Sequence, residues 1–138
     1  MRILILCTHN ARRSQMAEAL LRWLAGSRCE VFSAGTQPAE VDPDVFTVLH
    51  ELGVPTEDLR SKSVEEFAGQ HFDVVLTVCD QAREQCPVFP GAPRMMHWSL
   101  SDPGVVTDPE ERLAAFRRVR DELVERLRRE LLPLLERA

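Results

Sequence analysis

Cysteine side chains are the strongest nucleophiles in this chain of 138 residues, and the first of the four has an informative setting. Cys7 ends an apolar run, and Arg13 and Ser14 follow it closely. The loop that begins with Cys7 contains Thr8, His9, Asn10, Ala11, Arg12, Arg13 and Ser14. A loop that leads into a helix offers free backbone N–H groups and the positive end of the helix dipole, which together bind anions. The same field favours a thiolate, so we expect Cys7 to act as a nucleophile at neutral pH.

Three further side chains complete the chemistry that this loop predicts. Arg13, at the start of the helix, can donate two parallel N–H bonds to a tetrahedral oxyanion. Ser14 can donate a hydrogen bond to the thiolate, and Asp102, which precedes a proline, is a candidate general acid for a departing oxygen. The alternative is a buried structural thiol beside an exposed arginine. The order strand, Cys-x5-Arg-Ser, helix favours the oxyanion site.

The other cysteines are Cys29, Cys79 and Cys86. The chain carries no recognisable export signal, so we expect a cytoplasmic protein in which cysteines indicate metal binding or redox chemistry. Zinc is disfavoured because residues 80–85 offer no further soft ligand, and we expect neither a metal nor a cofactor. Cys29 is expected to be an inert thiol. Cys79 and Cys86 could also be two core thiols at the end of a strand.

The elements that must position these residues alternate between strand and helix. Apolar and β-branched runs predict strands at 2–7, 30–33, 72–78 and 94–97. Helical periodicity and capping residues predict helices at 14–24, from 43 to about 52, a short one begun by a capping box at 63–66, and a long terminal one after Asp108.

This alternation predicts an α/β fold, a single domain over residues 1–138 with an open parallel four-stranded sheet and helices on both faces. Ligands in such folds bind at the carboxyl ends of the strands, so Cys7, Cys79 and Asp102 are expected at one rim. The length suits one domain. A net charge of −5 argues against nucleic acid or an acidic membrane as partner, and no apolar run approaches the roughly 20 residues of a membrane span.

Several segments carry a resemblance to a known family. They are CTHNARRSQMAE at 7–18, SAG at 33–35, LTVCDQAREQCP at 76–87, HWSLSDP at 97–103 and FRRVRDE at 116–122. In order and spacing the chain resembles the low-molecular-weight tyrosine phosphatase superfamily, and closely its thioredoxin-coupled arsenate reductases. The resemblance implies that Cys7 is the nucleophile, Arg13 binds the oxyanion and Asp102 acts as the acid. It also implies that Asn10 holds the shape of the loop and that Ser14 favours the thiolate.

The resemblance further implies a thiol relay. Cys7 attacks arsenate, Cys79 attacks the Cys7 sulfur and releases arsenite, and Cys86 attacks Cys79 to leave a Cys79–Cys86 disulfide for an external dithiol. The implied reductant is thioredoxin, and the implied role is arsenical resistance by detoxification. Phosphate is expected as a competing anion, weak phosphatase activity as a side reaction, and a monomer as the working state.

The spacing of the relay cysteines predicts a conformational switch. Two helical turns between Cys79 and Cys86 would hold their Cα atoms about 10 Å apart, whereas a disulfide tolerates at most about 7 Å. We therefore expect residues 79–92 to be helical when reduced and looped out when oxidised. Pro87 and Pro90 would weaken the helical end.

Two other functions remain open. One is a tyrosine phosphatase that uses Cys7, Arg13 and Asp102, although the chain has no Tyr where such phosphatases usually place a pair. The other is a non-enzymatic thiol redox sensor.

Some arsenate reductases of this type bind potassium beneath the loop. Asn10, Glu18 and Ser33 match three of the ligands, but Lys62 stands where the fourth, an Asp, is expected. Its ammonium group could replace the ion, so we predict no dependence on potassium. His9 is expected to face solvent, and His97 and Trp98 to be packing residues.

Overall fold

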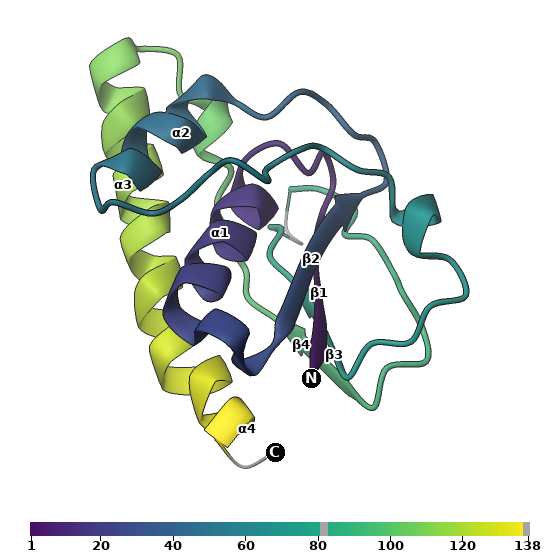
Figure 1. Cartoon of the computed structure of the whole chain (residues 1–138). Helices are drawn as coiled ribbons and strands as arrows, with labels where there is room; N and C mark the ends of the chain where they lie inside the picture. Colours follow the sequence, from purple (N-terminus) through teal and green to yellow (C-terminus); the bar gives the residue numbers. More distant parts are fainter. Residues whose placement is uncertain (81–82, 137–138) are drawn as a thin grey trace.

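The computed structural model describes residues 1–80 and 83–136. Four parallel strands form one sheet in the order β2-β1-β3-β4 (Figure 1). They are β1 (Arg2–Cys7), β2 (Glu30–Gly35), β3 (Val74–Thr77) and β4 (Arg94–His97). β1 is central and fully apolar inside, which is typical of a parallel strand covered on both faces. The predicted four-stranded parallel sheet is confirmed.

Helices connect and cover the strands. They are α1 (Arg13–Ala25), α2 (Pro43–His50), α3 (Pro109–Arg126) and α4 (Leu132–Glu136), with 3₁₀ helices η1 (Gly26–Arg28), η2 (Val64–Phe67) and η3 (Pro103–Val105) and a π-helical turn η4 (Leu127–Leu131). The carboxylates of Asp42 and Asp108 cap α2 and α3, and a proline follows each. Both of these predicted helix starts are confirmed.

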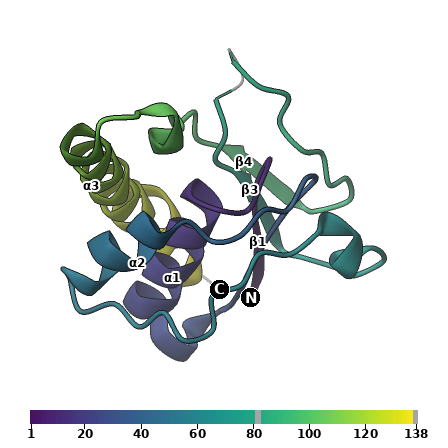
Figure 2. The ribbon, with the colours of Figure 1, turned by 90° about the horizontal axis from the view of Figure 1, so that it is seen from above.

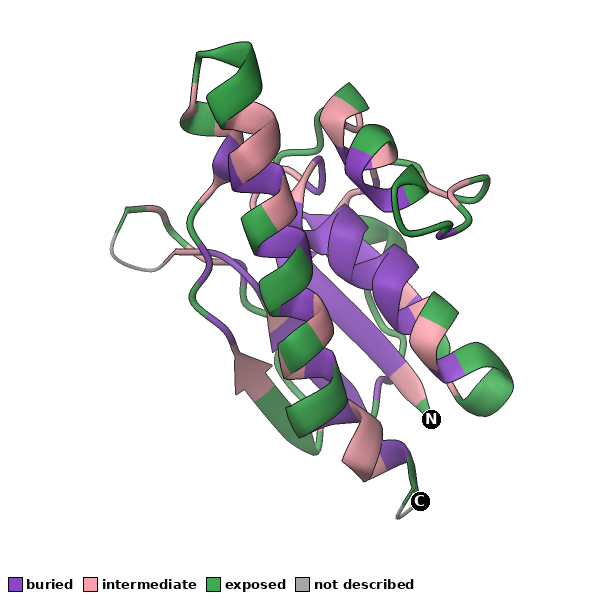
Figure 3. Ribbon diagram, turned by 90° about the vertical axis from the view of Figure 1, so that its left-hand side faces the viewer, coloured by how far each residue is buried: buried purple, intermediate pink, exposed green. Residues whose placement is uncertain are grey.

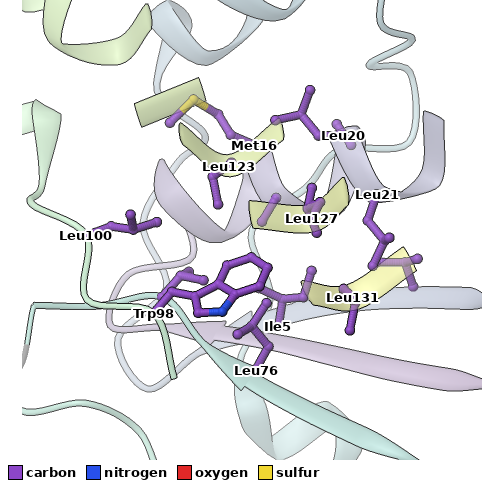
Figure 4. Close-up of a cluster of buried hydrophobic side chains, with 14 of the residues drawn as sticks. Ile5, Met16, Leu20, Leu21, Leu76, Trp98, Leu100, Leu123, Leu127 and Leu131 are labelled. Atoms are coloured by element: carbon purple, nitrogen blue, oxygen red, sulfur yellow. The ribbon is translucent and has the colours of Figure 1, made fainter. Parts of the chain in front are cut away.

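The two faces of the sheet are covered unequally. On one side of the sheet α1 and α3 cover the strands and α2 packs against these two helices, while η2 lies on the opposite side (Figures 1 and 2). Under the helices, Trp98 packs among leucines of the terminal helices and apolar side chains of β1 and β3 (Figure 4). On the second face of the sheet, a smaller apolar cluster forms around Phe67 and Phe72. The outer surface of α3 is exposed, whereas β1 and much of α1 are buried (Figure 3).

Two of the predicted helices show additional detail at their ends. At the predicted capping box, Ser63 accepts a bond from the Glu65 N–H, and the Glu66 carboxylate bonds to the Ser63 backbone while it also pairs with Arg60. The terminal helix continues through the π-helical turn η4 before Pro133. Proline lacks an N–H and collides with the carbonyl four residues earlier in a regular α-helix, so a widened turn accommodates it. Within the described residues, no helix combines the length and apolarity that a membrane crossing requires.

Candidate active site: the oxyanion loop and the relay cysteines

The register of β1 with β3 places the oxyanion loop and the relay cysteines at the same end of the sheet, where the strands terminate. Leu6 of β1 pairs with Thr77 of β3, and the Val78 N–H donates to the Leu6 carbonyl at 2.9 Å. Cys7 therefore ends β1, and Cys79 lies two residues past the end of the neighbouring strand β3. Neighbouring strands of a sheet are about 4.8 Å apart. Both cysteines are buried in the same apolar cluster. The rim predicted from the sequence is where the structure places them.

The loop after Cys7 is held by the buried side chain of Asn10. Its backbone is left-handed, with φ of 49°, a conformation that Asn tolerates better than most residues. Its amide donates to the hydroxyls of Ser14 and Ser33 at 2.8 and 2.9 Å. Its carbonyl oxygen accepts from the Lys62 backbone N–H and from Gln15 at 2.8 and 2.9 Å. One side chain thus fixes the curvature of the loop from inside.

Gly35, at the end of β2, supports the same loop by leaving space. A Cβ atom there would lie 2.5 Å from the Thr8 carbonyl oxygen and 2.9 Å from the Asn10 nitrogen. Any side chain would therefore push the loop outward. The close approach of two backbones explains why glycine stands at this position.

The Cys7 sulfur lies 2.8 Å from the Ser14 hydroxyl oxygen. Because the Asn10 amide donates to that oxygen, the hydroxyl hydrogen is free to point at the sulfur. Arg12 precedes α1 without providing a side-chain cap, so the first N–H groups of α1 have no side-chain acceptor there. The arrangement favours a thiolate and an anion in front of it.

Arg13 lies buried at the start of α1, where its guanidinium is held by Glu84. Its two terminal nitrogens donate to the two Glu84 oxygens at 2.5 and 3.0 Å. One of them also donates to the Leu100 carbonyl at 2.9 Å. Burial alone would lower the pKa of Arg13, but the bond to Glu84 and the nearby charge of Cys7 raise it overall. Burial would raise the pKa of Glu84, but its bond to Arg13 lowers it. In this disulfide-bonded structure a carboxylate therefore occupies the fork that an oxyanion would need.

Asp102 lies close to the same arginine. Its Oδ2 atom is 3.9 Å from a terminal nitrogen of Arg13 and 3.4 Å from one of Arg12, and its Oδ1 atom caps η3 through the Gly104 N–H. Asp102, Asp80 and Glu84 line one cavity of about 330 Å³. A proton donor at this position can reach an oxyanion bound at Arg13.

Arg12 anchors the loop to the helical layer. It donates to Asp42 at 2.9 Å, and Asp42 also accepts from Arg112 of α3 at 2.5 Å. Burial would raise the pKa of Asp42, but hydrogen bonds from Arg112, the Asp44 backbone and Arg12 lower it to about 2. The carboxylate therefore links the end of the oxyanion loop to two helices.

Cys79 and Cys86 form a disulfide, with Cα atoms 5.9 Å apart. The described part of 79–92 contains no helix, as predicted for the oxidised form; Gln81 and Ala82 lie outside the described residues. The helical reduced form stays a prediction. Cys79 is fully buried, whereas Cys86 is half-buried and lines a cavity of about 470 Å³ together with Thr8 of the oxyanion loop. Cys7 and Cys29 are free.

His97 is a neighbour of the disulfide that the sequence did not indicate. One of its ring nitrogens lies within 4.8 Å of both sulfurs. These three side chains could hold a soft metal only with the disulfide open, because thiolates are the metal ligands. His97 was predicted only to pack, and Glu84 was not singled out. Both contacts join segments far apart in sequence, so no local pattern signals them.

Lys62 occupies the pocket beneath the loop. Its buried ammonium group lies 3.4 Å from Glu18 and donates to the Arg60 carbonyl at 2.7 Å. Burial lowers its pKa, although the charge of Glu18 opposes that effect. Glu18 also accepts a bond from Ser33 at 2.5 Å. A potassium ion does not fit among Asn10, Glu18 and Ser33, because the Lys62 ammonium already lies beside Glu18. His9, expected to face solvent, is partly exposed, and its Nδ1 atom lies 3.0 Å from the Gln37 carbonyl oxygen.

Known proteins share this fold and this sequence pattern. Residues 2–138 match the family described as low molecular weight phosphotyrosine protein phosphatase, and the chain belongs to that family. An arsenate reductase from Halalkalibacterium halodurans is 37% identical over 128 residues, which are 91% of each chain.

Two solved structures extend this similarity. The arsenate reductase from Archaeoglobus fulgidus has a TM-score of 0.76 and 33% identity, over 92% of this chain and 96% of that one. A thioredoxin-dependent arsenate reductase from Corynebacterium glutamicum has a TM-score of 0.74 and 34% identity, over 98% of this chain and 61% of that one. The chain is therefore related to arsenate reductases within the phosphatase family.

Proposed function

We propose that this chain reduces arsenate to arsenite as a single unit spanning residues 1–138. Cys7 attacks the arsenic of an oxyanion bound by Arg13 and the loop N–H groups, while Asp102 protonates the departing oxygen. The observation that supports reduction rather than hydrolysis is the Cys79–Cys86 disulfide beside the Cys7 strand end. Hydrolysis needs only one of these three sulfurs.

The relay conserves electrons at each step. Cys79 attacks the Cys7 sulfur of the thiol–arsenic adduct, and the bonding pair leaves with arsenic as arsenite. Cys86 then attacks Cys79 and frees Cys7. An external dithiol closes the cycle by reducing the Cys79–Cys86 bond. The named activity of the Corynebacterium relative supports thioredoxin as that dithiol. We further propose a cytoplasmic monomer that provides arsenical resistance.

Glu84 adds a condition to this cycle. Because its carboxylate holds Arg13 when the disulfide is closed, arsenate must displace it or wait for the disulfide to open. Arsenate reduction and phosphate ester hydrolysis both begin with attack by Cys7 in the loop that is shaped by Asn10, Ser14 and Gly35. Weak phosphatase activity therefore accompanies reduction.

The decisive variant is Cys79→Ser. Arsenite formation with excess dithiol is expected to fall to background, because the adduct on Cys7 has no second thiol to resolve it. Hydrolysis of p-nitrophenyl phosphate is expected to persist. Cys29→Ser is the matched control, since Cys29 is a free thiol outside this site and its loss should change neither rate.

The result that contradicts the proposal is a Cys79→Ser protein that still forms arsenite at the original rate. Rapid hydrolysis by the unaltered protein, without arsenite formation, would favour the phosphatase alternative. Arsenite limited to one equivalent under excess reductant would favour the redox sensor.

A further inference from the structure

The Cys79–Cys86 couple lies in surroundings that make proton transfer necessary. Cys79 is fully buried, in contact with the apolar cluster that contains Val78, Trp98 and Leu100. When an incoming thiolate attacks the more exposed Cys86, Cys79 is the leaving group. A thiolate left in apolar surroundings is unfavourable unless it gains a proton or a hydrogen bond. The reduction step therefore needs a proton donor near Cys79.

His97 is placed to meet that need. A ring nitrogen lies within 4.8 Å of both sulfurs, and His97 lines a cavity of about 260 Å³ with Cys86 and Pro87. Its Nδ1 atom is 2.6 Å from the Thr77 hydroxyl. Its Nε2 atom is buried and has no hydrogen-bond partner among the described residues. A buried ring nitrogen without a partner is uncommon, because it forgoes a hydrogen bond that water would supply.

The Thr77 hydroxyl can pair with either neutral tautomer of the His97 ring. Thr77 also lies 3.5 Å from the Met96 carbonyl oxygen. If its hydrogen points to that carbonyl, Nδ1–H donates to the hydroxyl and Nε2 carries a lone pair. If its hydrogen points to Nδ1, Nε2 carries the hydrogen. The first tautomer accepts a proton from a thiol, and the protonated ring returns it.

We propose that His97 is the proton acceptor and donor of the Cys79–Cys86 couple, a role that rests on the proposed thiol relay. When the bond forms, His97 takes the proton of the Cys86 thiol. The Cys86 thiolate attacks the Cys79 sulfur, and Cys7 leaves with the bonding pair. When an external dithiol attacks Cys86, Cys79 leaves with the bonding pair and receives the proton from the imidazolium.

The separation observed here suits the oxidised state. Disulfide sulfurs carry no proton, so no contact with the ring is required. Opening the bond lets the sulfurs move from about 2 Å apart to at least the roughly 3.5–4 Å of non-bonded sulfurs, as the first step toward the predicted helical form. During that first step, a movement of about 1.5 Å toward the ring is enough to bring one sulfur into contact with it. Among the described residues lining this cavity with His97, the titratable neighbour is Cys86; the others are Val75, Thr77, Pro87, Val88, Met95 and Met96.

The test removes arsenate from the reaction. In the Cys7→Ser background the oxidised protein is reduced by dithiothreitol, and the free thiols are counted by mass after alkylation. His97→Asn retains an amide near Nδ1 that can bond Thr77 but lacks Nε2. Its reduction at pH 7 is expected to be roughly tenfold to a hundredfold slower. The two rates should converge at pH 9.5, because an imidazole ring carries no second proton to donate so far above its ordinary pKa of about 6.5. His50→Asn, which alters an exposed histidine of α2, should leave the rate unchanged.

Equal rates at pH 7, or a deficit of the same size at both pH values, would overturn the proposal, the second because it indicates a structural role. If His97→Asn unfolds, His97→Gln is measured; its amide can still donate a hydrogen bond near the position of Nε2, so we expect a smaller deficit at pH 7 and the same convergence at pH 9.5. Arsenite production by the unaltered protein is measured separately. If no arsenite forms, the proposed arsenate reduction is rejected, but the comparison of disulfide reduction rates with and without His97 still tests the role of His97.

Discussion

The oxyanion loop (residues 7–14) and the relay segment (here its described residues 79, 80 and 83–86) meet at the carboxyl ends of the strands but are held differently. The loop is fixed from beneath by buried hydrogen bonds of Asn10 and by the close approach of Gly35. The relay segment is held by one disulfide and by the contacts of Glu84. Preorganised donors stabilise developing charge, whereas sulfur transfer needs sulfurs that can approach one another in turn. The difference indicates a rigid binding region, and we predict a movable redox region beside it.

The largest expected effect comes from the arginine of the rigid region. Arg13→Lys removes the forked pair of N–H donors while keeping the charge. We expect kcat/KM for arsenate to fall about a hundredfold, the usual cost of losing an aligned donor at a developing oxyanion. Steady-state arsenite formation measures it, with Arg28→Lys of η1 as control. A loss below threefold would contradict the assigned role of Arg13.

Support of the rigid region should depend on pH through Asp42. Its pKa is lowered to about 2 from 3.8, so its stabilising effect is fully present above pH 4 and is lost as the pH falls through 2. Asp42→Asn is therefore expected to lower the free energy of unfolding at pH 7 by about 2 kcal/mol. Urea unfolding should show the difference shrinking between pH 5 and pH 2.5. A difference independent of pH would show that charge is not the cause.

Glu84 couples the two regions and gives a smaller effect. Glu84→Gln removes the carboxylate that holds Arg13 in the oxidised form. We expect phosphate to bind oxidised Glu84→Gln about tenfold more tightly than the oxidised parent, as for loss of one competing charged hydrogen bond. Isothermal titration calorimetry measures it, and Glu65→Gln on η2 is the control. An unchanged Kd would show that Glu84 does not compete with the anion.

The smallest expected effect concerns potassium. Because the Lys62 ammonium lies beside Glu18, exchanging potassium for sodium should leave arsenate reduction by the parent chain unchanged. Lys62→Ala leaves Glu18 without that cation, so this variant should lose activity and recover part of it with potassium. Activity of the parent chain that rises with potassium would contradict the assignment.

Local patterns predicted the rigid region better than the movable one. The strand at 2–7, the helix predicted at 14–24 and the strand at 94–97 depend on neighbouring residues, and the structure contains all three, the helix as Arg13–Ala25. The oxyanion loop after Cys7 is built from a strand end, a short loop and a helix start, all of which are recognisable in the sequence. Arg13 and Ser14 could therefore be identified from the sequence as site residues. Their catalytic roles remain predictions.

The contacts of the movable region depend on tertiary structure. Glu84 reaches Arg13 across 71 positions of sequence, and His97 meets Cys79 and Cys86 only because β4 pairs with β3. Neither contact has a spacing that a helix or a strand imposes. The strand predicted at 72–78 is also shorter in the structure, at Val74–Thr77, although the N–H groups of Asp73 and Val78 still donate to carbonyls of β1 on either side of it.

Disulfide mapping after a single turnover tests the relay most directly. The fully reduced chain is mixed with one equivalent of arsenate without reductant, quenched with an alkylating agent and analysed by peptide mass. The account predicts one equivalent of arsenite, a Cys79–Cys86 disulfide and alkylated Cys7, and in Cys86→Ser a trapped Cys7–Cys79 disulfide. Arsenite formed while Cys79 and Cys86 both remain free thiols would contradict it.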